Sequence, residues 1–103
     1  MRVCFHLKVR SERREEYGRH HSAVWPDVLA ELKAAGVRNY SIYAWRDGHE
    51  FGFLECDDWD AVQRHLGANE VMARWEAFMA EYLETPVEPG RSPELLTEVF
   101  RLD

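Results

Sequence analysis

The chain has 103 residues, of which 46% are hydrophobic, enough for one compact domain spanning 1–103 and too few for two. A formal net charge of -6 argues against nucleic-acid or anionic-membrane partners, which need clustered Lys and Arg. No apolar run approaches the length of a membrane span, no secretory leader is evident, and Cys4 and Cys56 have no CxxC spacing. We therefore expect a cytoplasmic protein with reduced thiols that binds a neutral small molecule.

Residues 2–9 alternate between two faces, which is typical of a half-buried strand. One face carries the apolar side chains Val3, Phe5, Leu7 and Val9, and the other carries Cys4, His6 and Lys8. Ser11 is suited to cap a first helix over 12–23. Pro26 predicts a bend between residues 22 and 26 and a second helix that stops at Gly36.

Two further strand patterns, at 39–45 and 50–56, flank an Asp-Gly pair at 47–48 that is a common hairpin turn. These strands should pair antiparallel. In the strand at 39–45, Tyr40 lies on one face and Tyr43 on the other, so neither face is clearly the solvent-exposed one.

Asp57 or Asp58 can cap a helix that runs to about Leu66, and Asn69 can cap a longer helix over 70–83. In the longer helix, large apolar side chains recur at helical spacing and indicate a core face.

A surface loop is predicted at 85–90 and a closing strand at 95–102. The order strand, helix, strand, strand, helix, strand predicts an α+β, ferredoxin-like antiparallel sheet with helices on one face. The aromatic residues on the second face predict a homodimer in which two sheets form a barrel-like assembly.

The segment from Tyr17 to Trp25 holds the most chemistry. Tyr17 and His21 should share a helix face, whereas His20 should point about 100° aside. Proton-transfer groups beside aromatic rings suggest a site for a small polyol. The alternative is that His21 is a core histidine and Trp25 only packs. Arg19 and His20 fit either a solvated face or a bond to a ligand hydroxyl.

The chain resembles the L-rhamnose mutarotases, which interconvert the α and β anomers of a deoxysugar. The similarity runs nearly end to end and rests on Glu16-Tyr17, Arg19, His21, Trp25-Pro26, the strand Asn39-Tyr40-Ser41-Ile42-Tyr43, Arg74-Trp75, Phe78-Met79 and Glu98-Val99-Phe100. The resemblance implies a ferredoxin-like dimer. It also implies that His21 is the catalytic proton donor and that Tyr17, Tyr40 and Trp75 contact the sugar.

One position departs from the family pattern, because Glu76 stands where a second tryptophan is expected. A tryptophan offers an apolar face to a sugar methyl group, whereas a carboxylate accepts hydrogen bonds from hydroxyls. Glu76 is therefore a candidate for substrate binding, unless it is simply a solvated helix residue. L-Rhamnose is the first expected substrate, and L-fucose or another aldose is the alternative.

Mutarotation needs one proton removed from the anomeric hydroxyl and one delivered to the ring oxygen, and it needs no cofactor. A histidine, with an ordinary pKa of about 6.5, can perform either transfer near neutral pH. We expect His21 to act at the anomeric centre or ring oxygen, with Tyr17 or Tyr40 holding the sugar and relaying the second proton.

Three other functions fit the same pattern. Ferredoxin-like dimers also serve as small monooxygenases and haem-handling proteins, since a fold does not fix a function. A divalent-metal site could use Cys4, His6, His20 and His21, but adjacent helical histidines rarely share one metal ion. A sugar-binding module without turnover is the third alternative.

Overall fold

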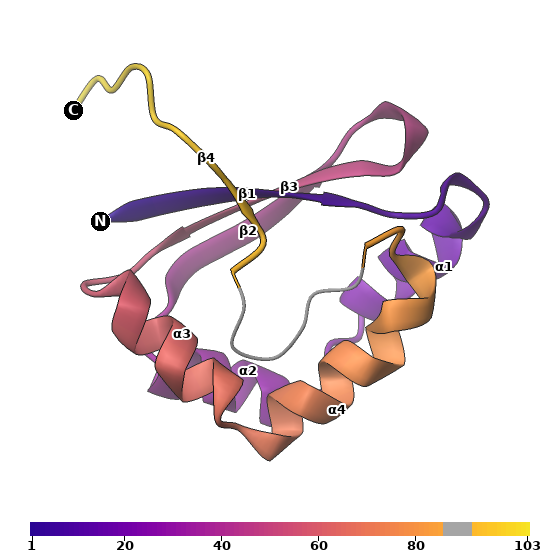
Figure 1. The fold of residues 1–103 in the computed structure, drawn as a ribbon, viewed down its shortest axis with the longest axis horizontal. Coiled ribbons are helices and arrows are strands. Elements are labelled where there is room, and N and C mark those ends of the chain that lie inside the picture. The colour runs from indigo at the N-terminus through magenta and orange to yellow at the C-terminus, as the bar shows by residue number, and fades with distance from the viewer. Residues whose placement is uncertain (86–91) are drawn as a thin grey trace.

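The computed structural model describes residues 1–85 and 92–103, which form a four-stranded antiparallel sheet with its helices on one face (Figure 1). The elements are β1 (Arg2–Lys8), η1 (Ser11–Arg13), α1 (Arg14–His21), α2 (Pro26–Ala34), β2 (Arg38–Ala44), η2 (Arg46–Gly48), β3 (His49–Glu55), α3 (Trp59–Gly67), α4 (Glu70–Met79), η3 (Ala80–Tyr82) and β4 (Glu94–Leu96), where η marks a short 3-10 helix. The strand order is β2-β3-β1-β4. The predicted α+β, ferredoxin-like fold is therefore confirmed.

Several local predictions are confirmed by the backbone. Trp25 has an extended conformation (φ -58°, ψ 135°) before Pro26, which opens α2 as its first residue. The side chains of Asp58 and Asn69 cap α3 and α4 by accepting hydrogen bonds from backbone N–H groups three residues on. Asp47 takes a positive φ of 62° in the turn between β2 and β3, as Asp and Asn tolerate better than most residues.

The start of the first helix differs from the prediction. A 3-10 turn precedes α1, and neither helix has a side-chain cap. The hydroxyl of Ser11 instead donates to the carbonyl of Asp47, 3.0 Å away in the turn before β3. The predicted Ser11 cap is wrong because this longer-range partner takes the hydroxyl. The long helix also ends earlier than predicted, since α4 changes to the 3-10 helix η3 at Ala80.

The closing strand is much shorter than the predicted 95–102, because β4 covers only Glu94–Leu96. The register explains the difference. Leu96 lies opposite Cys4 in β1, so continued antiparallel pairing would exhaust β1 within three further residues. Residues beyond Leu96 run past the sheet towards the C-terminus (Figure 1). The loop predicted at 85–90 lies, apart from Thr85, outside the described residues.

Two clusters of buried side chains fill the space between the sheet and the helices. One comprises Val9, Tyr17, Val28, Met72, Trp75, Met79, Tyr82 and Leu83, and the other comprises Val3, Phe5, Val37, Leu54, Cys56 and Val62. Gly52 lies opposite Phe5 across β1 and β3, where a Cβ atom would overlap the Phe5 ring. The absence of a side chain at this position therefore allows Phe5 to lie flat against the sheet.

Within residues 1–85 and 92–103, no helix covers the other face of the sheet (Figure 1). Tyr43 and Trp45 of the β2 side of the hairpin are 63% and 55% exposed, and Val99 and Phe100 in the C-terminal segment are 93% and 79% exposed. This chain therefore leaves large apolar side chains in solvent at the sheet and the C-terminus. In the described part of the chain, no helix is both long and apolar enough to span a membrane.

Candidate active site

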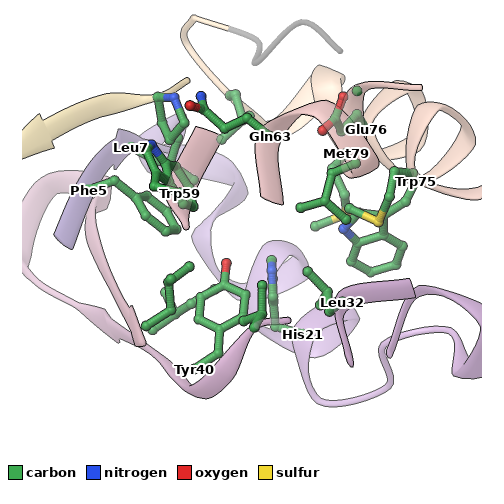
Figure 2. A pocket seen from close by; sticks show the side chains of 18 of the residues that line it. Phe5, Leu7, His21, Leu32, Tyr40, Trp59, Gln63, Trp75, Glu76 and Met79 are labelled. Atoms are coloured by element: carbon green, nitrogen blue, oxygen red, sulfur yellow. The ribbon is translucent and has the colours of Figure 1, made fainter. Parts of the chain in front are cut away.

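A cavity of about 170 Å³ lies between the inner face of the sheet and the helices. Its wall takes side chains from both core clusters, so it occupies the place where the two clusters would otherwise meet. All five residues predicted for the site line this cavity: Tyr17, His21, Tyr40, Trp75 and Glu76. Four of the labelled residues, His21, Tyr40, Trp75 and Glu76, surround the open space in Figure 2.

Helix α1 supplies Tyr17 and His21, which lie one helical turn apart and therefore on the same face. The two rings pack with centroids 4.5 Å apart. Nδ1 of His21 donates a hydrogen bond to the backbone carbonyl of Tyr17 at 3.2 Å, because a carbonyl can only accept. Nδ1 therefore carries the proton of the neutral ring, and Nε2 keeps a free lone pair.

Burial lowers the pKa of His21 below its ordinary value of 6.5, and the bond to the Tyr17 carbonyl only partly opposes this effect. The neighbouring His20 adds a smaller repulsion in the same downward direction. At neutral pH, His21 is therefore neutral and able to accept a proton at Nε2.

The two tyrosines that line the cavity keep their protons. Burial raises the pKa of both Tyr17 and Tyr40 above the ordinary 10.0. Tyr40 is 38% exposed as a residue, but its hydroxyl points into the cavity in Figure 2. Both hydroxyls are thus neutral hydrogen-bond donors and acceptors, as recognition of an uncharged polyol requires.

Helix α4 supplies Trp75, which is 8% exposed and lies in an aromatic cluster. Its ring stands edge-on to His21 with centroids 5.9 Å apart, and edge-on to Trp25 with centroids 5.0 Å apart. The Trp75 ring therefore forms an apolar wall on one side of the His21 imidazole, and Trp25 packs against Trp75. The bend before Pro26 is what brings Trp25 back against α4.

Glu76 adds the only carboxyl among the residues of the cavity wall that the structure describes. Its Oε2 atom is buried and has no hydrogen-bond partner among the described residues. Burial raises the pKa of Glu76 from 4.5 to about 7, so much of the group is protonated near neutral pH. Glu76 is therefore a half-buried residue of the cavity wall, with one carboxyl oxygen shielded from solvent.

The sequence alone did not identify two polar residues of the wall, Trp59 and Gln63 of α3. The Nε1 atom of Trp59 is a second buried group without a partner in the described structure. A signal was available, because Trp59, Gln63 and Leu66 follow helical spacing and Gln63 is polar on an otherwise apolar face.

Four other candidates lie elsewhere. Nε2 of His20 lies 3.0 Å from the Tyr82 hydroxyl, and Arg19 is exposed. The side chains of His6 and Cys4 lie on the face of the sheet away from the helices. There, Nε2 of His6 lies 2.9 Å from Nδ1 of His49. Neither Cys4 nor His6 lines the cavity. In residues 1–85 and 92–103, no cluster of three or more His, Cys, Asp or Glu side chains is arranged to hold a metal ion.

The fold and the cavity define a small ferredoxin-like α+β protein with histidine, tyrosine, tryptophan and carboxyl groups around one internal site. The sequence profile of the L-rhamnose mutarotase family matches residues 2–102. The chain belongs to the L-rhamnose mutarotase family.

Curated relatives align with nearly the whole chain. It is 36% identical to an L-rhamnose mutarotase of Klebsiella pneumoniae, with 99% of this chain and 98% of the relative aligned. It is 30% identical to that of Oceanobacillus iheyensis, again with 99% and 98% aligned.

Solved structures agree with the fold. The L-rhamnose mutarotase of Formosa agariphila superposes with a TM-score of 0.78 at 29% identity, covering 100% of this chain and 99% of that one. A tetracenomycin F2 cyclase from Streptomyces glaucescens has a TM-score of 0.69 at 13% identity, covering 100% of this chain and 97% of the cyclase. At that low identity, the likeness to the cyclase concerns the fold alone.

Proposed function

We propose that this protein is an isomerase that interconverts the α and β anomers of L-rhamnose or a related 6-deoxyhexose such as L-fucose. The observation that carries the proposal is the imidazole of His21, which lines the cavity and whose Nδ1 bonds to a carbonyl, so that the lone pair lies on Nε2. The named activity of relatives that align over the full chain supports the same reaction.

In this reaction His21 removes the proton of the anomeric hydroxyl through Nε2 and later returns it. The ring opens to an aldehyde, which rotates and closes again with the other configuration at the anomeric carbon. A positioned acid-base group contributes about 10² to 10⁴ in rate. That factor is sufficient because sugar anomers already interconvert unaided in water, and the reaction exchanges protons without any redox step.

The rest of the cavity wall suits a monosaccharide. Trp75 presents an indole ring that can cover the C–H groups of a sugar, while Tyr17 and Tyr40 bring neutral hydroxyls for its oxygens. Glu76 places a carboxyl where a tryptophan would offer only an apolar surface. The sugar that the site prefers will therefore reflect this substitution.

Magnetisation-transfer NMR on equilibrated sugar tests the proposal, because it reads anomer exchange without net reaction. We expect wild-type protein to accelerate exchange of L-rhamnose or L-fucose and His21→Ala to abolish the acceleration. His20→Ala is the matched control, since His20 bonds to Tyr82 rather than lining the cavity, and it should retain the activity.

An unchanged exchange rate in His21→Ala would refute the assigned role of His21. Two competing functions give different results. A binding module would be thermally stabilised by the sugar without faster exchange. A monooxygenase would consume O₂ and leave the anomers at their spontaneous rate.

The proposed enzyme acts as a cytoplasmic homodimer. The exposed apolar side chains on the free face of the sheet, including Tyr43 and Trp45, support a second copy as the partner. Cys4 and Cys56 are both free thiols, in keeping with a reducing compartment.

A further inference from the structure

One stripe of α4 faces the cavity. Met72, Trp75, Glu76 and Met79 line the wall and follow the spacing i, i+3, i+4 and i+7, which places them on one side of the helix. Met72, Trp75 and Met79 are buried apolar residues. The Glu76 carboxyl is unusual in this stripe, because a polar group inside an apolar wall costs free energy unless it is hydrogen-bonded.

Among the described residues, no hydrogen-bond partner offsets this cost. The buried Oε2 of Glu76 has no hydrogen bond, and neither has the buried Nε1 of Trp59 on the same cavity. Unsatisfied buried groups are rare in folded proteins and often mark a site that acts on a ligand. No described residue therefore satisfies Oε2 of Glu76, and Glu76 is a residue of the cavity wall.

Glu76 and His21 reach the cavity from different helices and from different sides. In Figure 2, His21 of α1 lies at the lower edge of the drawn pocket and Glu76 of α4 lies at its upper edge, with Met79 between them in this view. Ring opening of a sugar needs two proton-transfer groups that reach it from different directions. His21 is one such group, and the relay through Tyr17 or Tyr40 would require a hydroxyl that burial makes harder to ionise.

We propose that Glu76 is the second catalytic group, the acid that protonates the sugar ring oxygen while His21 removes the proton of the anomeric hydroxyl. This inference rests on the proposed mutarotase function and assigns its second proton.

The step balances. Nε2 of His21 takes the proton from the anomeric oxygen, whose electron pair forms the carbonyl bond as the bond from the anomeric carbon to the ring oxygen breaks. The ring oxygen takes the proton of the Glu76 carboxyl. The open-chain aldehyde then lies between an imidazolium and a carboxylate. After rotation about the bond next to the aldehyde, ring closure returns both protons, and neither group changes over the cycle.

The protonation states required at the start are those that the cavity favours. Burial lowers the pKa of His21 and raises that of Glu76 to about 7, so a neutral imidazole and a neutral carboxyl coexist near neutral pH. Tyr17 and Tyr40 are the other titratable groups on the described wall, and both stay neutral in this range.

The test compares pH profiles of anomer exchange for wild type, Glu76→Gln and the control Glu70→Gln. Glu70 is an exposed residue in the first turn of the same helix, so its substitution makes the same chemical change away from the cavity. For wild type and Glu70→Gln we expect a bell-shaped dependence of the exchange rate on pH. On the acid side, the exchange rate should rise as His21 loses its proton, at a pH below 6.5. On the alkaline side, the rate should fall as the Glu76 carboxyl loses its proton near pH 7.

Glu76→Gln cannot donate an acidic proton, so its rate should fall about tenfold or more at the optimum and lose the alkaline limb. A Glu76→Gln enzyme with the wild-type rate, or with the alkaline limb intact, would overturn the inference while leaving the mutarotase function in place. If wild type itself accelerates no sugar, the proposed function fails, and the role of Glu76 fails with it.

A direct measurement keeps the inference falsifiable even if Glu76→Gln folds poorly. The side-chain carboxyl of Glu76, followed by ¹³C NMR in wild-type protein, should titrate near pH 7, and its resonance should move when L-rhamnose or L-fucose is added. Titration near the ordinary 4.5, or no response to a sugar that the enzyme turns over, would contradict the proposal.

Discussion

A single backbone carbonyl decides which nitrogen of His21 can do chemistry. Because the Tyr17 carbonyl accepts the Nδ1 proton, the free lone pair belongs to Nε2. The next residue back, His20, differs by one position in the helix and lies against Phe78 and Tyr82 instead. Helical spacing in the sequence was sufficient to separate these two histidines, but the carbonyl bond that sets the tautomer required the structure.

Glu76 should also make the stability of the protein depend on pH. Its pKa is about 7 in the folded state and near 4.5 when exposed, so the folded chain holds this proton to higher pH. The contribution of Glu76 to stability is therefore fully present below about pH 4.5 and is lost as pH rises through about 7. Glu76→Gln has no proton to lose and avoids this fall.

Thermal unfolding at pH 5 and pH 8 measures the effect. The melting temperature of Glu76→Gln relative to wild type should increase at the higher pH by a few degrees. The expected size is of order 1 kcal/mol after screening of a half-buried group, and about 4–8 °C corresponds to 1 kcal/mol in a domain of this size. Glu70→Gln should show no such change, and an equal difference at both pH values for Glu76→Gln would argue against a shifted carboxyl.

At the scale of elements, patterns that depend on near neighbours were predictable, and those that depend on a distant partner were not. The caps at Asp58 and Asn69 and the bend at Pro26 involve residues within one turn, and each was predicted correctly. The Ser11 hydroxyl and the strand beyond Leu96 both depend on segments far along the chain. Apolar alternation can indicate an extended strand, but it cannot indicate how far the neighbouring strand continues.

The same distinction applies to the cavity. The five residues proposed for the site could be named from composition, spacing and resemblance, and all five line the cavity. The empty volume itself lies between the two core clusters, and it depends on the packing of side chains from strands β1, β2 and β3 and helices α1, α2, α3 and α4. Helical spacing places Trp59 and Gln63 on one face of α3, but the sequence does not indicate that this face lines the cavity, and both were missed.

The close fit of β3 against β1 gives a testable consequence. In Gly52→Ala the new Cβ would overlap the Phe5 ring, which lines the cavity, so Phe5 must shift. We expect a loss of about 1–3 kcal/mol in the free energy of unfolding, as overpacking typically costs. Urea denaturation measures it, and sugar turnover should weaken as well because the cavity wall moves.

Gly18→Ala is the matched control, with the same added methyl group. Nothing lies within 4 Å of a Cβ at Gly18, which occupies the interior of α1. This substitution should therefore stabilise the protein by about 0.5–1 kcal/mol through the better helix propensity of alanine. If both variants shifted stability in the same direction, the steric explanation for Gly52 would be wrong.

At the scale of the whole molecule, the helices protect one side of the sheet and leave the other open. Phe51 and Phe53 of β3 pair with His6 and Cys4 of β1 in register, so their side chains share the open face. Tyr43 extends this apolar surface onto β2. Three further apolar side chains lie beyond β4, on the segment that runs past the first residue of β1, and all are strongly exposed: Val99, Phe100 and Leu102. A second copy that faces this sheet would bury both sets of side chains, and this is the physical basis of the proposed homodimer.

The dimer can be tested with a charge placed on each side of the molecule. Light scattering on wild-type protein should give twice the chain mass of 12.2 kDa. Tyr43→Asp puts a carboxylate on the open sheet face, where burial against a partner would be costly, so this variant should shift to monomer at micromolar concentration. Leu29→Asp makes a similar change on the exposed surface of α2 and should remain dimeric. A monomeric wild type, or a dimer that Leu29→Asp breaks and Tyr43→Asp leaves intact, would place the interface elsewhere or remove it.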